Sequence, residues 1–486
     1  MNASLRSCLE CCCFAAALLA GCAAGPDYRR PPAEVPPAWQ PEPPWHEAVP
    51  SDAALKGDWW KVFHDADLDR LIELALQSNQ NLQVAAARLA QARDEVKVAE
   101  SDFYPTVDLS AAAARAKSSA NRPLSEYALP NTSTVQNDFI VGPTVNYEFD
   151  LFGRVRREVE GARASAEQAA ADYQNTRLLL IAQLASDYFT LRELDAEIDV
   201  LNRDLELQRG ALSFVNSRHE LGFATGLDLA QQQALLDSSG AQLELLQVQR
   251  AQNEHAIATL VGTPAPSFHL APLLLSPEIP VLPVGMPADL LQRRPDVAAA
   301  ERAMAAANAR IGVARAAYYP AVDLRPFVPG VGWESNTLAT LFDAPSRLWS
   351  FGVSATETLF DAGKTRANVR IASADYTAAV AAYRQTVLTA MEEVENGITG
   401  LSSLDRAATQ ADASVHSAQR AFDIASDRYK GGVDTYLDVI TAEQTLLANQ
   451  RQAVQIHGQQ FLTTVYLIKA LGGGWAGMPS TASRSD

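Results

Sequence analysis

Apolar residues recur every seven positions along two long stretches of the chain. In the first half the repeat passes through Leu184, Leu191, Ile198, Leu205 and Leu212. In the second half it passes through Val380, Val387, Val394, Leu401, Ala408, Val415, Phe422 and Tyr429. Sustained seven-residue spacing predicts helices that pack as coiled coils. We expect long helices over 154–218 and 364–430, the first roughly 100 Å long at 1.5 Å per residue.

The two halves of the chain repeat one another. Phe103–Leu109 matches Tyr318–Leu324, and Arg218–Gly222 matches Arg428–Gly432. Each half has the same order of elements: helix, strand, loop, strand, long helix, glycine turn and return helix. Self-similarity of this kind predicts a duplicated structural unit.

Between the helical stretches the period of the pattern changes from seven to two. In 144–151 the polar side chains Asn146, Glu148 and Asp150 alternate with apolar ones. This alternation is typical of a transmembrane β-barrel strand, although a strand of a soluble sandwich looks alike. Four strands are expected, at about 106–115, 139–151, 321–328 and 348–360. Four strands cannot close a barrel, so either the chain oligomerises or these strands form no barrel. Three chains would supply twelve.

The amino terminus predicts export and a lipid anchor. A short apolar segment ends in Leu19-Ala20-Gly21-Cys22. The pattern indicates a signal peptide over 1–21, and its last four residues resemble the lipobox of bacterial lipoproteins. In that interpretation Cys22 becomes the lipidated first residue and holds the protein to outer-membrane lipid. The alternative is an ordinary secreted protein.

These signals divide the chain into six segments. They are a signal peptide (1–21), a lipid-anchored proline-rich segment (22–57), a first repeat (58–262) with return helix 228–261, a linker (263–288), a second repeat (289–471) with return helix 434–471, and a flexible tail (472–486).

Composition narrows the function classes. The net charge is −17, which disfavours nucleic acid as a partner, because phosphate contacts need clustered basic side chains. Gly363-Lys364-Thr365 imitates the end of a phosphate-binding loop, but residue 358 is threonine where that loop needs glycine. The histidines are scattered without metal-ligand spacing. We expect no catalytic site, no metal and no cofactor.

Taken together, the motifs resemble those of the TolC-like outer-membrane efflux proteins, in the lipoprotein branch that includes OprM and NodT. The motifs are Asp58–Phe63, Asp150–Arg154, Leu291–Val297 with Tyr319-Pro320, and Leu359–Lys364. The resemblance implies a mainly α chain with a small membrane β-barrel. It implies a homotrimer with a twelve-stranded barrel in the outer membrane and an α-helical barrel in the periplasm. It also implies a periplasmic adaptor and an inner-membrane pump of the RND type as partners.

The glycine turns are the candidate site. They contain Gly222 and Gly226 in the first repeat, and Gly431 and Gly432 in the second. In the resemblance these turns form the periplasmic tip, where the second turn would place a gate. The hypothetical gate residues are Arg428, Tyr429, Asp434 and Asp438. For Asp434 the alternative is an N-cap of the return helix.

The pattern therefore predicts a passive export duct from the periplasm to the exterior. A channel for type I protein secretion and a lipid-anchored coiled-coil scaffold are the alternatives, and the strands favour a channel over a scaffold. The exported substrate is left open.

Overall fold

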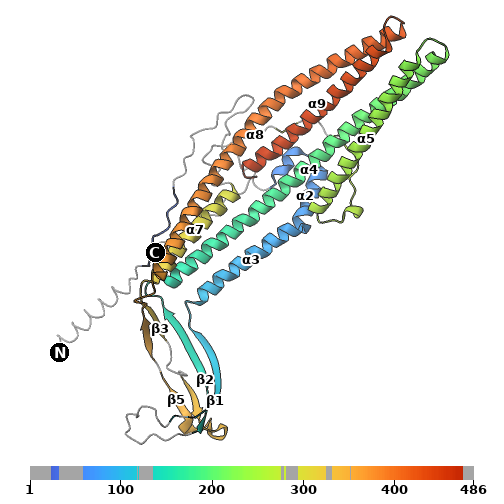
Figure 1. The fold of residues 1–486 in the computed structure, drawn as a ribbon. Helices are drawn as coiled ribbons and strands as arrows, with labels where there is room; N and C mark the ends of the chain where they lie inside the picture. The colour runs from blue at the N-terminus through green and yellow to red at the C-terminus, as the bar shows by residue number, and fades with distance from the viewer. Residues whose placement is uncertain are drawn as a thin grey trace. The chain divides into compact units, whose positions relative to one another are not determined.

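The computed structural model describes residues 23–31, 58–117, 119, 135–274, 279–280, 294–324, 331–350 and 352–473 (Figure 1). The chain divides into two compact units. The strand unit comprises Met1–Pro31, Leu89–Gln168 and Ala300–Tyr383; the helix unit comprises Pro32–Arg88, Ala169–Ala299 and Arg384–Asp486. Within the described residues, no helix combines the length and the apolarity that a membrane crossing requires.

The strand unit is built on an antiparallel sheet. Strand β1 (Thr106–Lys117) pairs with β2 (Val135–Phe149) along its whole length, from Thr106 opposite Asn146 to Lys117 opposite Val135. The other segments are β3 (Ala321–Leu324), β4 (Val331–Ser335), β5 (Arg347–Trp349) and β6 (Val353–Thr356). Strand β2 also pairs with β3 and β4, which in turn pair with β6 and β5.

The six segments lie in four rows, because β3 and β4 pair with the same strand at different heights. From Tyr147 to Val141 along β2 is six residues, whereas their partners Leu324 and Trp333 are nine apart. The number of rows matches the sequence-based expectation, but the expected unbroken strand 348–360 is wrong, because it is split into β5 and β6. Of the expected strand 321–328, the structure describes Ala321–Leu324 as β3, and residues 325–328 lie outside the described residues.

Strand β2 also differs from its expected range, 139–151, at both ends. It begins at Val135 and ends at Phe149. The upstream extension pairs with the far end of β1. The early end follows from Asp150, whose carboxylate accepts hydrogen bonds from the backbone N–H of Val155 (3.1 Å) and Arg156 (3.0 Å) and so caps the next helix.

The repeat is visible in the lengths of the helices. Helices α4 (Arg154–Glu220) and α8 (Lys364–Lys430) have 67 residues each, and α5 (Gly226–Leu260) and α9 (Tyr436–Ala470) have 35 each. Figure 1 shows α4 with α5 as one hairpin and α8 with α9 as a second. The shorter helices are α2 (Ala66–Ser78), α3 (Gln80–Ser101) and α7 (Pro295–Ala316), with 3₁₀ helices at Trp59–Phe63, Ala265–Ser267, Leu338–Thr340 and Ala344–Ser346.

The largest core lies in the helix unit, where apolar positions of α2, α4 and α9 meet. Phe189 of α4 stacks on Phe461 of α9, with ring centroids 4.8 Å apart. Trp59 and Trp60 are both 2% exposed and belong to this core. The heptad positions Leu184 and Leu191 are fully buried in it as well. The seven-residue pattern thus marks the faces along which the helices pack.

A buried arginine ties three helices together at the start of α7. Arg294 is 6% exposed. Its guanidinium donates to Asp296, to Glu393 of α8 (2.6 Å) and to the backbone carbonyl of Ala470 in α9 (3.0 Å). The sequence motif around Arg294 therefore has a structural role: it fixes the beginning of α7 against the end of the second repeat.

Candidate functional site

The second tip turn, residues 431–435, joins α8 to α9. Gly432 has φ +75°, a left-handed conformation that favours glycine. Its N–H donates to the carbonyl of Tyr429 (3.0 Å), and the N–H of Val433 donates to the carbonyl of Arg428 (2.9 Å). These two bonds close the end of α8 in the geometry of a Schellman motif. The turn is therefore set by its own backbone.

The first tip turn, residues 221–225, joins α4 to α5 in the same way. Gly222 has φ +78°, its N–H donates to the carbonyl of His219 (2.9 Å), and Phe223 N–H donates to the carbonyl of Arg218 (2.8 Å). Gly226 is the first residue of α5, two residues before the expected start of the return helix.

A threonine occupies the N-cap position of both return helices. In the first turn Thr225 and Asp228 form a complete capping box, each side chain accepting from the other's backbone N–H. In the second turn Thr435 occupies the N-cap position and its hydroxyl donates to Asp438 (2.8 Å), but no side chain caps a backbone N–H. Helix α9 therefore begins at Tyr436, and the expected start at Asp434 is wrong.

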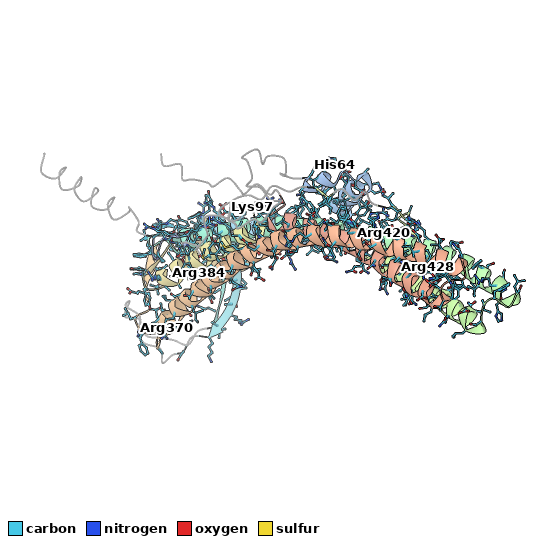
Figure 2. All side chains as sticks on the ribbon, turned by 90° about the horizontal axis from the view of Figure 1, so that it is seen from above. His64, Lys97, Arg370, Arg384, Arg420 and Arg428 are labelled. Carbon is cyan, nitrogen blue, oxygen red and sulfur yellow. The ribbon has the colours of Figure 1, made fainter. Side chains whose placement is uncertain are left out.

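Asp434 has a different partner. Its carboxylate accepts hydrogen bonds from both Nε and Nη2 of Arg428, the second at 2.9 Å. This bidentate pair bridges the turn, and the hydrogen bond from Arg428 lowers the pKa of Asp434. Figure 2 shows Arg428 near the end of α8, beyond Arg420. Asp438 is exposed on the first turn of α9. The N-cap alternative for Asp434 is thus not what the structure contains.

Tyr429 lies behind this surface instead of on it. It is 8% exposed and packs on Tyr436, with ring centroids 4.9 Å apart. The guanidinium of Arg218 lies over its ring, 4.8 Å from the centroid, and donates to its carbonyl at 3.3 Å. Burial raises the pKa of Tyr429. Of the four predicted gate residues, Arg428, Asp434 and Asp438 lie at the surface of the second turn. Tyr429 is buried and connects that turn to α4.

Cys22 lies outside the described residues, which begin at its neighbour Ala23. A Cβ at Gly153 would lie 2.8 Å from the Cα of Ala23, and the N–H of Ala24 donates to the carbonyl of Phe152 (2.9 Å). The chain after Cys22 therefore contacts the turn that joins β2 to α4.

The following residues are held firmly along the same unit. Arg157 of α4, 5% exposed, donates to the carbonyl of Ala24 (3.2 Å) and to Asp27 (2.8 Å). Tyr28 donates to Glu301 of α7 (2.7 Å), and Arg30 donates to the hydroxyl of Tyr383 on α8 (2.9 Å). We call residues 23–31 the amino-terminal strap. It contacts helices from both repeats.

Gly363-Lys364-Thr365, the imitation of a phosphate loop, is a helix start. The carboxylate of Asp361 accepts from the N–H of Gly363 (2.8 Å) and from the N–H of Thr365 (2.7 Å). Asp150 caps α4 in the corresponding way. Among the described residues, no group of three or more His, Cys, Asp or Glu side chains is arranged to hold a metal ion.

The sequence interpretation missed two features of the helix unit. One is Arg218, whose guanidinium connects the two tip turns through Tyr429. The other is a set of buried carboxyls, including Asp204 and Glu443. A signal existed for both, since polar residues on the buried face of a long helix need partners. An apolar repeat does not by itself indicate them.

Comparisons with known proteins place this architecture. The family model described as "Outer membrane efflux protein" matches residues 71–263 and 286–473. A pyoverdine export outer membrane protein of Pseudomonas putida, OpmQ, is 32% identical over 439 residues, which cover 89% of this chain and 91% of the relative. A toluene efflux pump outer membrane protein of the same species, TtgF, is 32% identical over 475 residues, covering 95% and 96%.

Solved structures agree with the sequence relatives. The outer-membrane channel OprN superposes with a TM-score of 0.85 at 32% identity, covering 94% of this chain and all of that one. The Campylobacter jejuni outer membrane channel CmeC gives a TM-score of 0.85 at 25% identity, covering 95% and 97%.

Proposed function

Because the chain belongs to the outer membrane efflux protein family and is an outer-membrane efflux channel protein, we propose that three copies form one continuous passive duct. Each copy contributes its four rows of strands to a twelve-stranded barrel and its long helices to a periplasmic α-barrel. The duct performs no chemistry, and the energy for export comes from a separate pump.

The ends of the sheet carry this proposal. Within the described residues β1 pairs only with β2, and β6 only with β3. Every residue of β1 is exposed in the single chain. In lipid, unpaired backbone groups at a sheet edge each cost several kcal/mol, roughly, because no water can satisfy them. Joining β1 of one copy to the row of β5 and β6 in the next removes both edges.

The amino-terminal strap supports lipidation at Cys22. It brings the chain to the turn between β2 and α4, where the strands that would lie in the membrane give way to helix. Acyl chains on Cys22 would therefore enter the bilayer beside the barrel. In this proposal residues 1–21 are removed, and the remaining chain keeps the other five segments expected from the sequence.

The second tip turn is the proposed gate. Threefold symmetry would bring Arg428, Asp434 and Asp438 around the axis, with Tyr429 fixing the turn against α4. Carboxylate rings in a narrow pore favour cations, and the exposed Arg428–Asp434 pair can exchange partners when another protein docks on the tip.

A periplasmic adaptor and an inner-membrane pump of the RND type are the proposed partners. The relatives named above are associated with pyoverdine and with toluene, which supports small organic molecules as cargo over secreted proteins. The coding regions beside this chain give a direct check, since an adaptor and a proton-driven pump are expected there.

Two measurements test the channel together. The full-length protein in mild detergent should have the mass of a trimer, and the same preparation should conduct in a planar bilayer. A monomer that associates with membrane without conducting would favour the lipid-anchored scaffold. Cys22→Ser should abolish lipid labelling while the trimer still forms, and unchanged labelling would contradict the anchor.

A further inference from the structure

Helices α4, α5 and α9 enclose polar side chains between two apolar clusters. Apolar contacts on one side include Leu201 of α4 and Leu447 of α9. On the other side Tyr436 packs with Val439. Between them lie four buried polar residues: Asp204 and Gln208 of α4, Ser239 of α5 and Glu443 of α9, exposed by 7%, 0%, 2% and 4%. We call these four residues the acid seam.

Hydrogen bonds connect the acid seam across the helices. The amide Nε2 of Gln208 donates to Asp204 (2.6 Å) and to the hydroxyl of Ser239 (3.0 Å). Gln232 of α5 donates to the carbonyl of Gln208 (3.1 Å) and accepts from the hydroxyl of Tyr436 (2.6 Å). Tyr436 is the first residue of α9. The seam therefore reaches the point where α9 leaves the second tip turn.

One donor is missing from this network. The Oε1 atom of Gln208 is buried and has no hydrogen-bond partner among the described residues. A buried acceptor without a donor is costly. Asp204 and Glu443 are carboxyls in the same seam, and a carboxyl donates only when it is protonated. A proton on one of them would therefore give the seam an additional hydrogen-bond donor.

Among the residues that the structure describes, no basic side chain is paired with either carboxyl of the seam. Burial raises the pKa of Asp204 to about 6, and burial together with the charge of Asp204 raises that of Glu443 to about 7. The other titratable group here is Tyr436, and no group on α8 shifts either carboxyl. The arginines nearest along α4 and α9, Arg203, Arg209 and Arg451, are bonded to the carboxylates of Asp199, Glu206 and Glu197.

Buried acids elsewhere on α4 are treated differently. Asp195 is fully enclosed but accepts from Arg192 (2.9 Å) and Arg250 (2.6 Å). Glu197, two turns before the seam, accepts from Arg451 (2.9 Å). Helix α4 therefore pairs Asp195 and Glu197 with arginine and leaves Asp204 without such a partner.

We propose that the acid seam is a proton-dependent clamp, in which Asp204 and Glu443 hold protons while α9 is packed on α4 and α5 and release them when α9 separates. The proton on the pair removes one buried charge and supplies the seam with a hydrogen-bond donor. The pair titrates as one coupled unit.

The direction of the pH effect follows from the raised pKa values. In a separated state the carboxyls ionise near their ordinary values, about 4. Between there and about pH 7 the packed state holds protons that the separated state has lost, so packing weakens as pH rises and the full penalty is present above that range. Mild acidification should therefore tighten the beginning of α9. A consequence for channel opening rests on the proposed channel function, whereas the clamp itself does not.

Hydrogen exchange on the full-length protein in detergent tests the clamp. For backbone amides of 436–447, corrected for intrinsic exchange, protection should fall at least about tenfold from about pH 5.5 to about pH 8. Asp204→Asn with Glu443→Gln should keep high protection at both values. The control is Glu244→Gln on α5, whose side chain is exposed and which should behave like the parent.

Two results would overturn the clamp. One is a parent whose α9 protection does not depend on pH, and the other is a double variant that keeps the parent's dependence. If the double variant fails to fold, Glu443→Gln alone should at least halve the logarithmic change. Conductance is recorded separately: a pH-dependent clamp with unaltered conductance would leave the clamp standing and count against its link to the channel.

Discussion

The two tip turns close their helices with the same backbone geometry and use their side chains for different purposes. Both have five residues, a left-handed glycine and the same pair of backbone hydrogen bonds. In the first turn Thr225 and Asp228 form a capping box. In the second, Asp434 instead pairs with Arg428 across the turn. The two repeats therefore share the backbone geometry that ends the helix. In the second turn the charged side chains do not cap the return helix and are available for another role.

The largest expected effect is a change in channel conductance when the acidic residues of the second turn are replaced. Asp434→Ala combined with Asp438→Ala should raise single-channel conductance by roughly twofold or more and lower cation preference, because a carboxylate ring is lost from a narrow pore. Planar-bilayer recording measures both. Asp228→Ala, the matching position of the first turn, is the control and should change conductance less. A double variant that is trimeric and conducts like the parent would place the constriction elsewhere.

The next experiment examines what the turns share. Gly222→Ala and Gly432→Ala should each destabilise their turn by about 1–2 kcal/mol, because an L residue pays that strain in the left-handed region. Rates of limited proteolysis at the tip should rise similarly for both. Gly210→Ala provides the contrast, since Gly210 is inside α4 with open space at its Cβ position, and alanine there should stabilise by about 0.5–1 kcal/mol. Unequal effects at the two turns would show that their backbones are not equivalent.

A smaller difference concerns the caps. Thr225→Ala removes a side chain that caps a backbone N–H and should cost about 1 kcal/mol. Thr435→Ala removes only a contact with Asp438 and should cost a few tenths, roughly, because no backbone donor loses its partner. Hydrogen exchange in the first turns of α5 and α9 measures the two separately. Equal losses would mean that Thr435 caps α9 in solution.

The smallest expected effect is that the second tip turn does not respond to pH near neutrality. Arg428 lowers the pKa of Asp434, so their pair is formed above that pKa and is lost only as pH falls through it. The second tip turn should therefore be unchanged between about pH 5 and about pH 8, in contrast to the acid seam above it. Added salt should weaken the pair, since it is exposed. A transition of the turn itself within that pH range would contradict this assignment.

The sequence was most informative where packing repeats over many residues. The heptad positions Leu184, Leu191 and Val394 are fully buried, because a long helix must show one continuous apolar face to its neighbours. Strands were harder to place, since Ala111–Ala114 carries little alternation and β4 was not expected at all. A short strand is defined mostly by its partners, which the local pattern does not contain.

The candidate site was predicted in part. Glycines identified both turns, because left-handed backbone has few other solutions. The partner of Asp434 was not predictable, since capping and ion pairing both suit an aspartate beside a helix start. The acid seam escaped notice for a related reason: Asp204 and Glu443 are 239 positions apart in the chain, and only the fold brings their helices together.

The equal lengths of the paired helices constrain how this chain can evolve. With 67 residues in both α4 and α8 and 35 in both α5 and α9, losing one heptad from a single hairpin would shorten it by roughly 10 Å relative to the other. Within each hairpin, the long helix and the return helix must also change in length together. Insertions and deletions in descendants of this gene should therefore be found in compensating sets, two per hairpin and mirrored between the repeats, so that gene length changes in steps.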